Sequence, residues 1–571
     1  MSKVNIVVPY YNNPLDDFKK LVFSLEGQCF KDFTVTVVFD GDLESFKKVQ
    51  KEYYNNEECV TEFPLFLELL KENKGASYAR NYGAKISGES ICPKNGSSLS
   101  GEILFFIDAD CQLRPGMLRE CVDQLDSNTN VDFVYGNYLF GDTEQRHEAK
   151  KFCAYELETM NYISTMSPVR RRAFNKVKGF NTNLPYFQDW DLFYRISKNG
   201  NGGKYINENI FITSIPKEGD ISSIKDTLSN KAKTFRKANK IEDKELVVTS
   251  FGASYQALQR AKMLGADYIH AEAVPRLNYD NWKGTYMVGL FNETAQAFNN
   301  HLMHMVGKKI FHFIGTDAFQ LYNNHSTLFL DAFYEALQKE NATIFANSPR
   351  LLKELKRCGF EKSKLLYSPI YNIDQYKSTK PLPKEFTVGV YFTDSNPMTM
   401  LHDKSGLSNI PMIVDVASQL PHIKFKFFGG REKYSHKTLD KPFPDNIEFC
   451  GRIKEYEMVE FINSCSCILR STIHDGFPQS PIHFMLCGRQ AIVSCPDEEL
   501  KYSIKLKYED ILENIDDAKK DMVDCIKQAY DNSDALLNKT DEIKKYYGNL
   551  MSVNVFKEKI YEALNENKIQ R

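Results

Sequence analysis

Short apolar runs alternate with amphipathic stretches of helical length from the first residues of the chain onward. Residues 4–8 (VNIVV), 34–39 (TVTVVF) and 103–107 (ILFFI) are rich in apolar and β-branched residues, whereas residues 14–25 and 115–125 have helical spacing. Strands of this composition are typical of sheets that are covered on both faces. The alternation therefore predicts an α/β fold.

The same alternation starts afresh twice further along the chain. A strongly charged stretch at 233–245 precedes strand-like 246–251, helical 254–264 and strand-like 310–314. Prolines and lysines at 377–385 then precede strand-like 386–392 and 424–428, helical 454–464, and charged helices from about residue 516. We therefore predict three α/β parts, with boundaries at 1–240, 241–384 and 385–571.

Composition narrows the class of protein. With 571 residues the chain is too long for one hydrophobic core, and its formal net charge of −2 gives no overall basic field for nucleic acid. No apolar run approaches the roughly 18–20 residues that span a bilayer, and the N-terminus lacks a signal-peptide layout. The 13 cysteines include no CxxC pair, which favours reduced, mostly buried thiols. We expect a cytoplasmic protein with no nucleic-acid partner.

The first candidate chemistry lies directly after the third predicted strand, at Asp108 and Asp110. Two carboxylates one residue apart at the rim of a parallel sheet lie where α/β proteins bind ligands. They can hold Mg²⁺ or Mn²⁺, which prefer oxygen ligands and share coordination with substrate phosphates. A lone Asp-x-Asp is also common as a turn or helix cap, so the pattern alone leaves both interpretations open.

Five motifs in order make this region specific: VVPYYN (7–12), FDGD (39–42), NKGASYARN (73–81), FIDADC (106–111) and KGFNTNLPYFQDWDLFYRI (178–196). From about residue 3 to 235 the chain closely resembles family 2 glycosyltransferases, which have the GT-A fold. The resemblance implies a nucleotide-sugar donor, Mn²⁺ or Mg²⁺ at Asp108 and Asp110, and inversion at the sugar carbon. The donor-binding positions that it implies are Pro9, Tyr11, Asp40, Lys74, Gly75, Arg80, Asp108 and Asp110.

The last of these motifs carries the expected catalytic base. Family members usually have Glu-Asp at the start of a helix, and here Gln188-Asp189 stands in that place, so the base maps to Asp189. A helix N-cap is the alternative role for this residue. Trp190 and Asp191 follow as candidate acceptor residues, although Trp190 is equally well explained as a core residue.

The chain departs from the pattern of family 2 glycosyltransferases in three ways, which limits how many of the family's functional roles can be assigned to its residues. Phe39 and Asp42 differ from the family's Asp-Asp-Gly-Ser turn. The chain has no Gln-x-x-Arg-Trp motif, which argues against a processive, membrane-embedded polymerase. Residues 190–230 contain no histidine that could be a third metal ligand, so metal dependence is expected on the two carboxylates alone.

Residues 445–496 carry a second resemblance, to the donor-binding lobe of two-lobed GT-B glycosyltransferases, especially family 4. The sequence DGFPQSPIHFMLCG (475–488) keeps a Gly-Phe loop and a Cys-Gly pair, but His483 replaces the second of two glutamates. The segments 313–319 and 346–360 resemble the first lobe, and FGGREK (428–433) takes the place of a phosphate-contacting loop. The second-site donor residues implied are Gly430, Arg431, Lys433, Asp475, Gly476, Phe477 and His483.

These resemblances lead to the expectation of a bifunctional glycosyltransferase: a GT-A domain followed by a GT-B (double Rossmann-like) unit. It would transfer sugars from nucleotide-diphospho-sugars, UDP being the family's commonest choice, to a glycan, glycolipid or glycoprotein acceptor. A lipid-linked acceptor would bring peripheral membrane contact. The alternative is that only the N-terminal transferase is active, while the C-terminal lobes bind the acceptor or act as a scaffold.

Two other classes are less compatible with the residues. Sugar-nucleotide synthesis should show a Gly-rich loop with Arg or Lys after the first strand, and VVPYYNNP lacks it. A pure binding module is disfavoured by the intact Asp108, Asp110 and Asp189.

Overall fold

The computed structural model describes most of the chain, and contacts between residues divide it into two compact units. Of the described residues, those up to Asp243 form one unit and those from Lys244 onward form the other. The predicted α/β class is confirmed, and the division into three parts stays a prediction. The residues described are 3–55, 58–89, 101–141, 143, 145–215, 228–251, 254–270, 281–290, 305–315, 342–377, 380–392, 410–430, 443–472, 476–494, 497–507 and 514–566.

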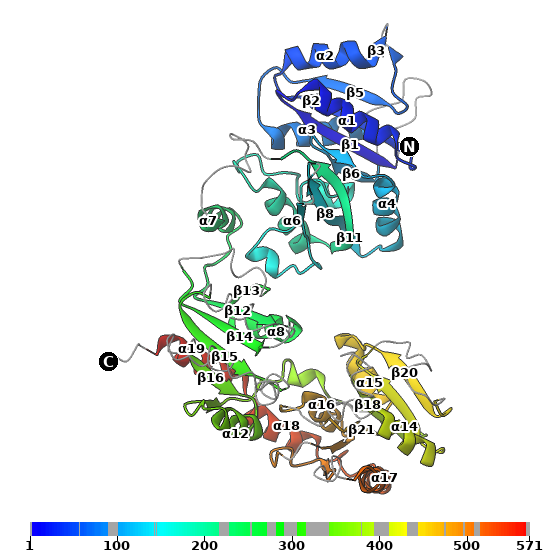
Figure 1. The fold of residues 1–571 in the computed structure, drawn as a ribbon, viewed down its shortest axis with the longest axis vertical. Helices are drawn as coiled ribbons and strands as arrows, with labels where there is room; N and C mark the ends of the chain where they lie inside the picture. Colours follow the sequence, from blue (N-terminus) through cyan, green and yellow to red (C-terminus); the bar gives the residue numbers. More distant parts are fainter. Residues whose placement is uncertain are drawn as a thin grey trace. The chain divides into compact units, whose positions relative to one another are not determined.

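The first unit is built on one mixed β-sheet (Figure 1). The order is β5-β2-β1-β6-β10-β8-β11-β7, with β9 beside β8. Strands β5, β2, β1 and β6 are parallel, β10 runs antiparallel to both of its neighbours, and β8 and β11 pair in parallel. The elements are β1 (Val4–Tyr10), α1 (Leu15–Glu26), β2 (Phe33–Phe39), α2 (Leu43–Tyr53), β3 (Tyr54–Asn55), β4 (Glu58–Cys59), β5 (Leu65–Leu69), α3 (Ala76–Glu89), β6 (Ile103–Phe106), β7 (Gln112–Leu113), α4 (Met117–Ser127), β8 (Val131–Phe140), β9 (Arg146–His147), β10 (Val169–Arg170), α5 (Arg171–Lys176), α6 (Gln188–Asn199), β11 (Gly202–Thr213) and α7 (Leu228–Ala238).

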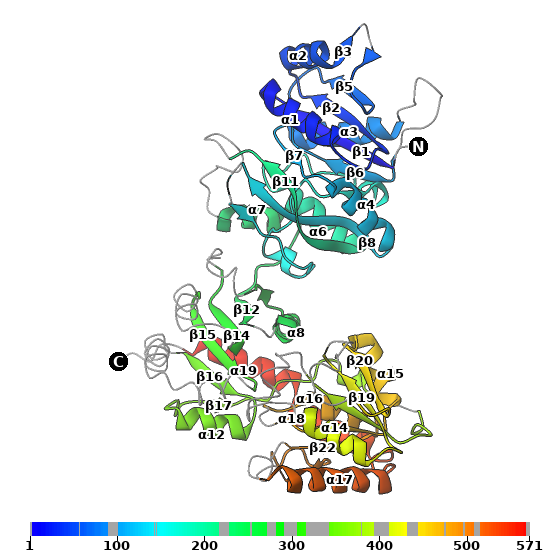
Figure 2. The same ribbon diagram turned by 45° about the vertical axis from the view of Figure 1, so that its right-hand side comes forward.

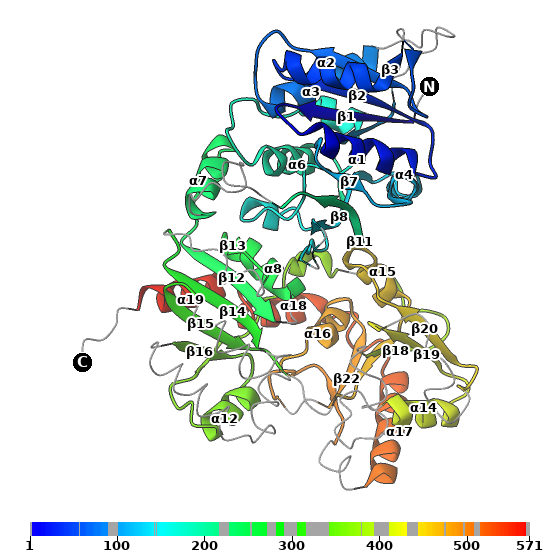
Figure 3. The same cartoon turned by 45° about the horizontal axis from the view of Figure 1, so that its top comes forward.

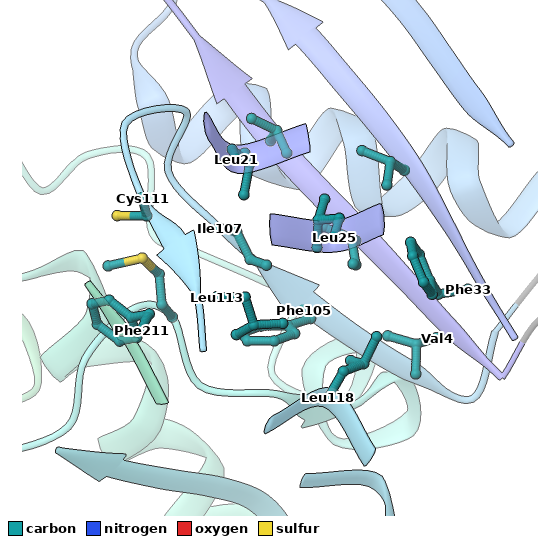
Figure 4. Close-up of a cluster of buried hydrophobic side chains, with 14 of the residues drawn as sticks. Val4, Leu21, Leu25, Phe33, Phe105, Ile107, Cys111, Leu113, Leu118 and Phe211 are labelled. Carbon is teal, nitrogen blue, oxygen red and sulfur yellow. The ribbon is translucent and has the colours of Figure 1, made fainter. Parts of the chain in front are cut away.

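The core of this unit explains why the apolar runs become strands. Strand β2 is buried at every position and β1 at nearly every one, as expected for a parallel sheet covered on both faces. Helix α1 places Phe18, Leu21, Val22 and Leu25 on one buried face, which is the spacing of an amphipathic helix. Figure 4 shows Leu21 and Leu25 facing the sheet near Phe33 and Phe105.

Because β1, β2, β5 and β6 are parallel, the polar segments that follow them emerge at the same edge of the sheet. Two glycines permit the close packing there. Gly41 has a φ of 75°, and a Cβ on it would lie 2.5 Å from the backbone nitrogen of Asn73. Gly83 brings α3 so close to β1 that a Cβ would lie 2.4 Å from Cγ1 of Val7.

The second unit contains two separate parallel sheets (Figures 2 and 3). Their orders are β13-β12-β14-β15-β16-β17 and β20-β19-β18-β21-β22-β23. Their elements are β12 (Leu246–Phe251), α8 (Ser254–Leu264), β13 (Asp267–Tyr268), β14 (Gly284–Leu290), β15 (Lys308–Phe313), β16 (Thr343–Ala346), α12 (Pro349–Arg357), β17 (Lys364–Leu365), β18 (Thr387–Tyr391), α14 (Ile410–Gln419), β19 (Lys424–Phe428), β20 (Ile447–Gly451), α15 (Met458–Asn463), β21 (Cys467–Arg470), α16 (Gln479–Leu486), β22 (Gln490–Val493), β23 (Ile504–Lys505), α17 (Ile515–Asp531), α18 (Thr540–Leu550) and α19 (Val553–Asn565).

The last helix ties the two sheets of this unit together. Helix α19 follows the second sheet in the sequence but packs beside β15 of the first, as Figure 3 shows in red against green. Phe556 contacts the rings of Tyr286 and His312, and the Tyr561 hydroxyl donates a 2.8 Å hydrogen bond to the carbonyl of Leu264. The first sheet of this unit therefore packs against both α8, which follows its β12, and α19, which comes after the second sheet in the sequence.

Two expectations from composition can be compared with the described residues. Within them, no helix is long and apolar enough to cross a membrane. Every cysteine in that part of the chain is a free thiol, and most are buried or half-buried, as the sequence predicts.

The packing of α3 on β1 gives a prediction for stability. Replacing Gly83→Ala places a methyl group against Val7, whose β-branched side chain has little rotamer freedom. We expect a loss of about 1–3 kcal/mol in the free energy of unfolding, measured by urea denaturation. Lys85→Ala, on an exposed position of the same helix, is the matched control and should change stability by less than about 0.5 kcal/mol. Equal effects of the two substitutions would contradict the close packing.

Candidate active site

The polar edge of the first sheet surrounds a cavity of about 990 Å³. Its walls come from the ends of β1, β2, β6 and β8, the start of α3, the start of α6 and the segment 161–166. Of the residues predicted from the sequence, seven line it: Pro9, Tyr11, Asp40, Gly75, Arg80, Asp108 and Asp110, together with the predicted base Asp189. The structure therefore brings most of the predicted donor site to one place.

Asp40 organises the loop in front of α3. Its carboxylate is almost fully buried and accepts hydrogen bonds from the backbone N–H groups of Lys74 and Gly75, both at 2.7 Å. The Lys74 side chain lies outside the cavity lining, pairs with Glu72 at 3.4 Å and covers the ring of Tyr78. Asp40 thus fixes the backbone at Gly75. The Lys74 side chain, which was predicted to bind the donor, lies outside the lining of the cavity.

Asp42 departs from the family's motif and has a structural role. One carboxylate oxygen accepts a hydrogen bond from the Ser45 N–H at 3.0 Å, which caps α2. The other oxygen accepts from the Asn12 N–H at 2.8 Å. The loops after β1 and β2 are therefore joined.

Arg80 connects the two acidic parts of the cavity. Its side chain is buried, and it donates to Oδ1 of Asp108 at 2.7 Å and to Oε1 of Gln188 at 3.3 Å. Gln188 is the first residue of α6, directly before the predicted base. A planar guanidinium can hold two acceptors in fixed directions, so Arg80 sets the distance between the Asp-x-Asp motif and α6.

Asp110 is half-buried in the lining of the same cavity as Asp108. The hydroxyl of Ser214, just past β11, donates a hydrogen bond to its Oδ2. Burial raises the pKa of Asp110, with a further upward contribution from the charge of Asp108, while the Ser214 hydrogen bond opposes the rise. Ser214 was not predicted from the sequence, because nothing in its local pattern signals contact with a residue more than 100 positions away.

The two carboxylates fit a divalent cation. Mg²⁺ is commonly held by one or two carboxylates, with substrate phosphates and water completing its shell. In the described ranges, no cluster of three or more His, Cys, Asp or Glu side chains forms a self-contained metal site. A cation here would therefore depend on ligand oxygens in addition to Asp108 and Asp110.

Asp189 lies in the first turn of α6 at the cavity wall. Phe187, not Asp189, is the N-cap residue, and its φ of 57° is rare for a non-glycine residue. Oδ1 of Asp189 accepts from the Trp190 N–H at 2.8 Å, and Oδ2 accepts from the Asn161 amide at 3.1 Å. Burial raises the pKa of Asp189, although these two hydrogen bonds and the charge of Arg80 oppose the rise. A raised pKa suits a proton acceptor.

The candidate acceptor residues Trp190 and Asp191 are placed elsewhere than expected, because both are buried and neither lines the cavity. The Trp190 ring stacks on Phe235 with centroids 3.9 Å apart, and its indole N–H donates to the carbonyl of Leu157 at 2.6 Å. Asp191 accepts two hydrogen bonds from Arg195, at 2.6 and 2.8 Å. Both residues hold α6 in place, so Trp190 has the core role that was its alternative.

Other aromatic residues line the cavity instead. Tyr138 stacks between His147 and Phe211, with centroids 4.5 and 4.7 Å apart. Burial, with the charge of Asp189, raises the pKa of Tyr138 to about 12. Sequence reasoning missed Tyr138 because it did not single out β8, although VDFVYGNYLF has the β-branched and aromatic composition of a strand.

The candidate residues in the second unit are described only in part, because Arg431, Lys433 and Asp475 lie outside the described residues. Phe477 and His483 line a second cavity. His483 stacks on Tyr376 at 3.8 Å, and burial lowers its pKa to about 3, so it is neutral. Gly430 and Gly476 are glycines for steric reasons: a Cβ would lie 2.0 Å from the ring of Phe392 and 1.9 Å from the carbonyl oxygen of Ile314, respectively.

Comparison with known proteins finds a family match that lies within the first unit. Residues 5–183 match the sequence model of glycosyl transferase family 2. A glucosyl-dolichyl phosphate glucuronosyltransferase from Haloferax volcanii is 24% identical over 195 residues, which cover 32% of this chain and 56% of that protein. The first unit carries a glycosyltransferase domain. The matched part of this chain thus spans about half the length of the Haloferax volcanii protein.

Solved structures of other proteins are weakly similar. TarS 1-349 from S. aureus, in complex with UDP, has 19% identity and a TM-score of 0.29, covering 37% of this chain and 60% of that chain. HepE from Anabaena, in complex with UDP and glucose, has 11% identity and a TM-score of 0.42, covering 57% of this chain and 100% of that chain. Neither similarity is strong enough to assign a ligand to this glycosyltransferase domain.

The bridging position of Arg80 gives a second prediction. Arg80→Lys keeps the charge, but an ammonium group cannot hold Asp108 and Gln188 in the same fixed directions. We expect the free energy of unfolding to fall by about 1–3 kcal/mol in urea denaturation. Arg119→Lys is the control, since Arg119 is half-exposed, pairs with Asp123 at 3.8 Å and lies over the ring of Phe30, contacts that a lysine can also make. An unchanged stability of Arg80→Lys would contradict the bridging role.

Asp189 gives a pH-dependent prediction. The raised pKa of Asp189 means that its carboxyl group holds a proton more tightly in the native state than in the unfolded chain. The free energy of unfolding therefore falls as the pH rises above the pKa that an aspartate has in the unfolded chain, because the buried carboxylate must then ionise. Asp189→Asn should therefore raise the melting temperature at pH 7 by about 2–4 °C, the equivalent of about 1 kcal/mol. Calorimetry at pH 7 and below pH 4 measures this, and the gain should vanish at the lower pH. A gain that is equally large at both pH values would contradict the assignment.

Proposed function

We propose that the first unit transfers a sugar from a nucleotide-diphospho-sugar to a hydroxyl of a glycan, glycolipid or glycoprotein acceptor. UDP-sugars are the first donors to test. The observation that carries the proposal is that Asp189 lines the same cavity as Asp108 and Asp110, with Arg80 between them. A cavity of about 990 Å³ also lies at the upper end of the usual range for a small-molecule site.

The geometry supports single displacement with Asp189 as the base. An acceptor hydroxyl at the cavity wall gives its proton to Asp189 while its oxygen forms a bond to the anomeric carbon. The bond from that carbon to the nucleotide diphosphate breaks on the opposite side, which inverts the configuration. The Asn161 amide holds the carboxylate in one orientation, and burial favours its taking up the proton.

Metal dependence is part of this proposal. Asp108 and Asp110 would hold Mn²⁺ or Mg²⁺, which when bound neutralises the diphosphate leaving group. Ser214 orients one oxygen of Asp110, and Arg80 orients one oxygen of Asp108. Asp108 and Asp110 both line the cavity in which the diphosphate would lie.

We further propose a second transferase site of GT-B type in the second unit, formed by lobes at 241–384 and 385–571. The two all-parallel sheets and their shared cavity of about 740 Å³ support it. An acceptor-binding or scaffolding role is the alternative. The free thiols suit a cytoplasmic enzyme, and a lipid-linked acceptor would bring peripheral membrane contact.

Donor hydrolysis tests the proposal on the full chain. UDP-, GDP- and TDP-sugars are incubated with Mn²⁺ or with a chelator, and release of the nucleotide is measured together with binding of the nucleotide by calorimetry. For the donor used by the first unit, we expect Asp110→Ala and Asp189→Asn each to lower turnover by about 10²-fold or more. Asp123→Asn, on the exposed side of α4, is the control and should leave turnover unchanged.

Each outcome has a separate meaning. A metal-dependent donor that Asp110→Ala abolishes supports the first site. A donor still turned over by Asp110→Ala supports a second active site. Absence of nucleotide binding to the whole chain, with and without Mn²⁺, would contradict the transferase proposal.

A further inference from the structure

We propose that the first unit glycosylates an uncharged pyranose sugar, which packs on Tyr186 and Phe187 and forms hydrogen bonds with hydroxyl groups in the lining beside Asp189. This inference rests on the proposed transferase function and names the acceptor that Asp189 would deprotonate. The side chains that carry it line the same cavity as the base. We call Tyr138, Thr165, Tyr186 and Phe187 the acceptor wall.

The acceptor wall comes from a different part of the chain than the predicted donor site. The predicted donor residues belong to the loops after β1 and β2, to α3 and the loop before it, and to the turn after β6. The rest of the lining comes from β8, β9, the segment 161–166 and the residues around the start of α6, which include Asp189. In a single displacement the acceptor approaches the anomeric carbon opposite the leaving diphosphate, and it must reach the base. The lining around Asp189 is therefore where the acceptor binds.

The charge of this lining disfavours an anionic acceptor group. Of the described residues between 138 and 189 that line the cavity, none is a lysine or an arginine. Arg80 also lines the cavity, but its guanidinium already binds Asp108 and Gln188. A phosphate acting as the nucleophile would meet the Asp189 carboxylate, and two like charges at close range repel each other. A neutral hydroxyl meets no such repulsion, which favours an uncharged acceptor.

Two aromatic side chains lie directly before Gln188 and the base in the sequence. The rings of Tyr186 and Phe187 are nearly perpendicular, at 84°, with centroids 5.9 Å apart, and both residues are half-buried. Phe187 has a φ of 57°, which non-glycine residues adopt rarely, and such strained positions cluster at ligand sites. A pyranose has an apolar face of C–H groups, and burying that face against an aromatic ring is favourable. The pair thus offers a sugar ring an apolar surface next to Asp189.

Three hydroxyl groups of the acceptor wall are available to a ligand. They belong to Tyr138, Thr165 and Tyr186, all half-buried in the cavity lining. None of the three forms a hydrogen bond with another residue in the part of the chain that the structure describes. A serine or threonine acceptor has a single hydroxyl, which the base would engage, and none left for these groups. A sugar has several hydroxyls around an apolar face, so it matches both the rings and the hydroxyl groups.

Tyr138 is the most firmly placed of these groups. Its ring is stacked between His147 and Phe211, with interplanar angles of 10° and 12°. Burial, with the charge of Asp189, raises the pKa of Tyr138 to about 12, so the hydroxyl keeps its proton at neutral pH. A fixed, protonated hydroxyl close enough to feel the charge of the base can donate to a sugar hydroxyl next to the reacting one.

Transfer to simple acceptors tests the inference on the full chain, with Mn²⁺ and the donor whose turnover Asp110→Ala abolishes. The acceptors are the methyl pyranosides of glucose, galactose, mannose and N-acetylglucosamine, a peptide that contains serine and threonine, and a polyprenyl phosphate in detergent. Mass spectrometry measures whether each of them gains the sugar of the donor. We expect transfer to at least one pyranoside and to neither of the other two acceptors.

Substitutions in the acceptor wall separate its two kinds of contact. We expect Tyr186→Ala to raise KM for the pyranoside about tenfold or more, and Tyr186→Phe, which keeps the ring, to raise it about threefold or less. Tyr138→Phe keeps the stack on His147 and Phe211 but loses the hydroxyl, and should raise KM about three- to tenfold. In each variant kcat should change less than KM, because binding of the acceptor is what is lost. Phe23→Ala removes an exposed ring on α1, outside the cavity lining, and is the control with an unchanged KM.

The inference is overturned if Asp110→Ala abolishes hydrolysis of the donor, yet no pyranoside accepts the sugar. It is also overturned if the peptide or the polyprenyl phosphate accepts the sugar in place of a pyranoside, or if KM is the same in Tyr186→Ala, Tyr138→Phe and Phe23→Ala. In all these results the transferase itself stands. Absence of nucleotide binding to the whole chain would instead contradict the transferase and this inference together.

Discussion

The candidate active site depends above all on the buried guanidinium of Arg80. It joins Asp108, which follows β6, to Gln188, which begins α6, although these residues are 80 positions apart in the sequence. Without that connection, the carboxylates suited to a metal and the carboxylate suited to a base would lie on independent elements. The surrounding structure keeps Arg80 in place: α3 packs against β1 through Gly83, and Asp40 fixes the loop that begins α3.

The cavity also shows how the same residue types divide between chemistry and support. Asp40, Asp42 and Asp191 are acidic residues of the motifs, yet Asp40 and Asp42 accept hydrogen bonds from backbone N–H groups, and Asp191 accepts from Arg195 and Asn239. Asp108, Asp110 and Asp189 keep oxygen atoms at the cavity wall. The rise in the pKa of Asp189 follows from this arrangement, because burial penalises the charge that two hydrogen bonds only partly compensate. Burial of the Asp189 carboxylate therefore makes it more basic and at the same time lowers the free energy of unfolding at neutral pH.

Much of the fold could be predicted from the sequence, because the strands of a covered parallel sheet are continuously apolar. The runs at 4–8, 34–39, 246–251 and 424–428 correspond to β1, β2, β12 and β19 within two residues. The ordered motifs likewise identified most of the cavity lining. Trp190 was harder to place, since periodicity does not reveal whether an aromatic ring next to a base faces the ligand or, as here, Phe235. The roles of Ser214 and Asn161 depend on long-range packing that no local pattern encodes.

The most direct test of the central claim is the affinity for UDP with and without Mn²⁺, measured by calorimetry on the wild-type chain and on Asp108→Asn. A donor site built on the Asp-x-Asp motif predicts that Mn²⁺ tightens UDP binding by about tenfold or more, equivalent to about 1.4 kcal/mol, and that Asp108→Asn removes the gain. Equal affinity with and without the metal, or a gain that survives Asp108→Asn, would contradict the claim that these carboxylates form the donor site.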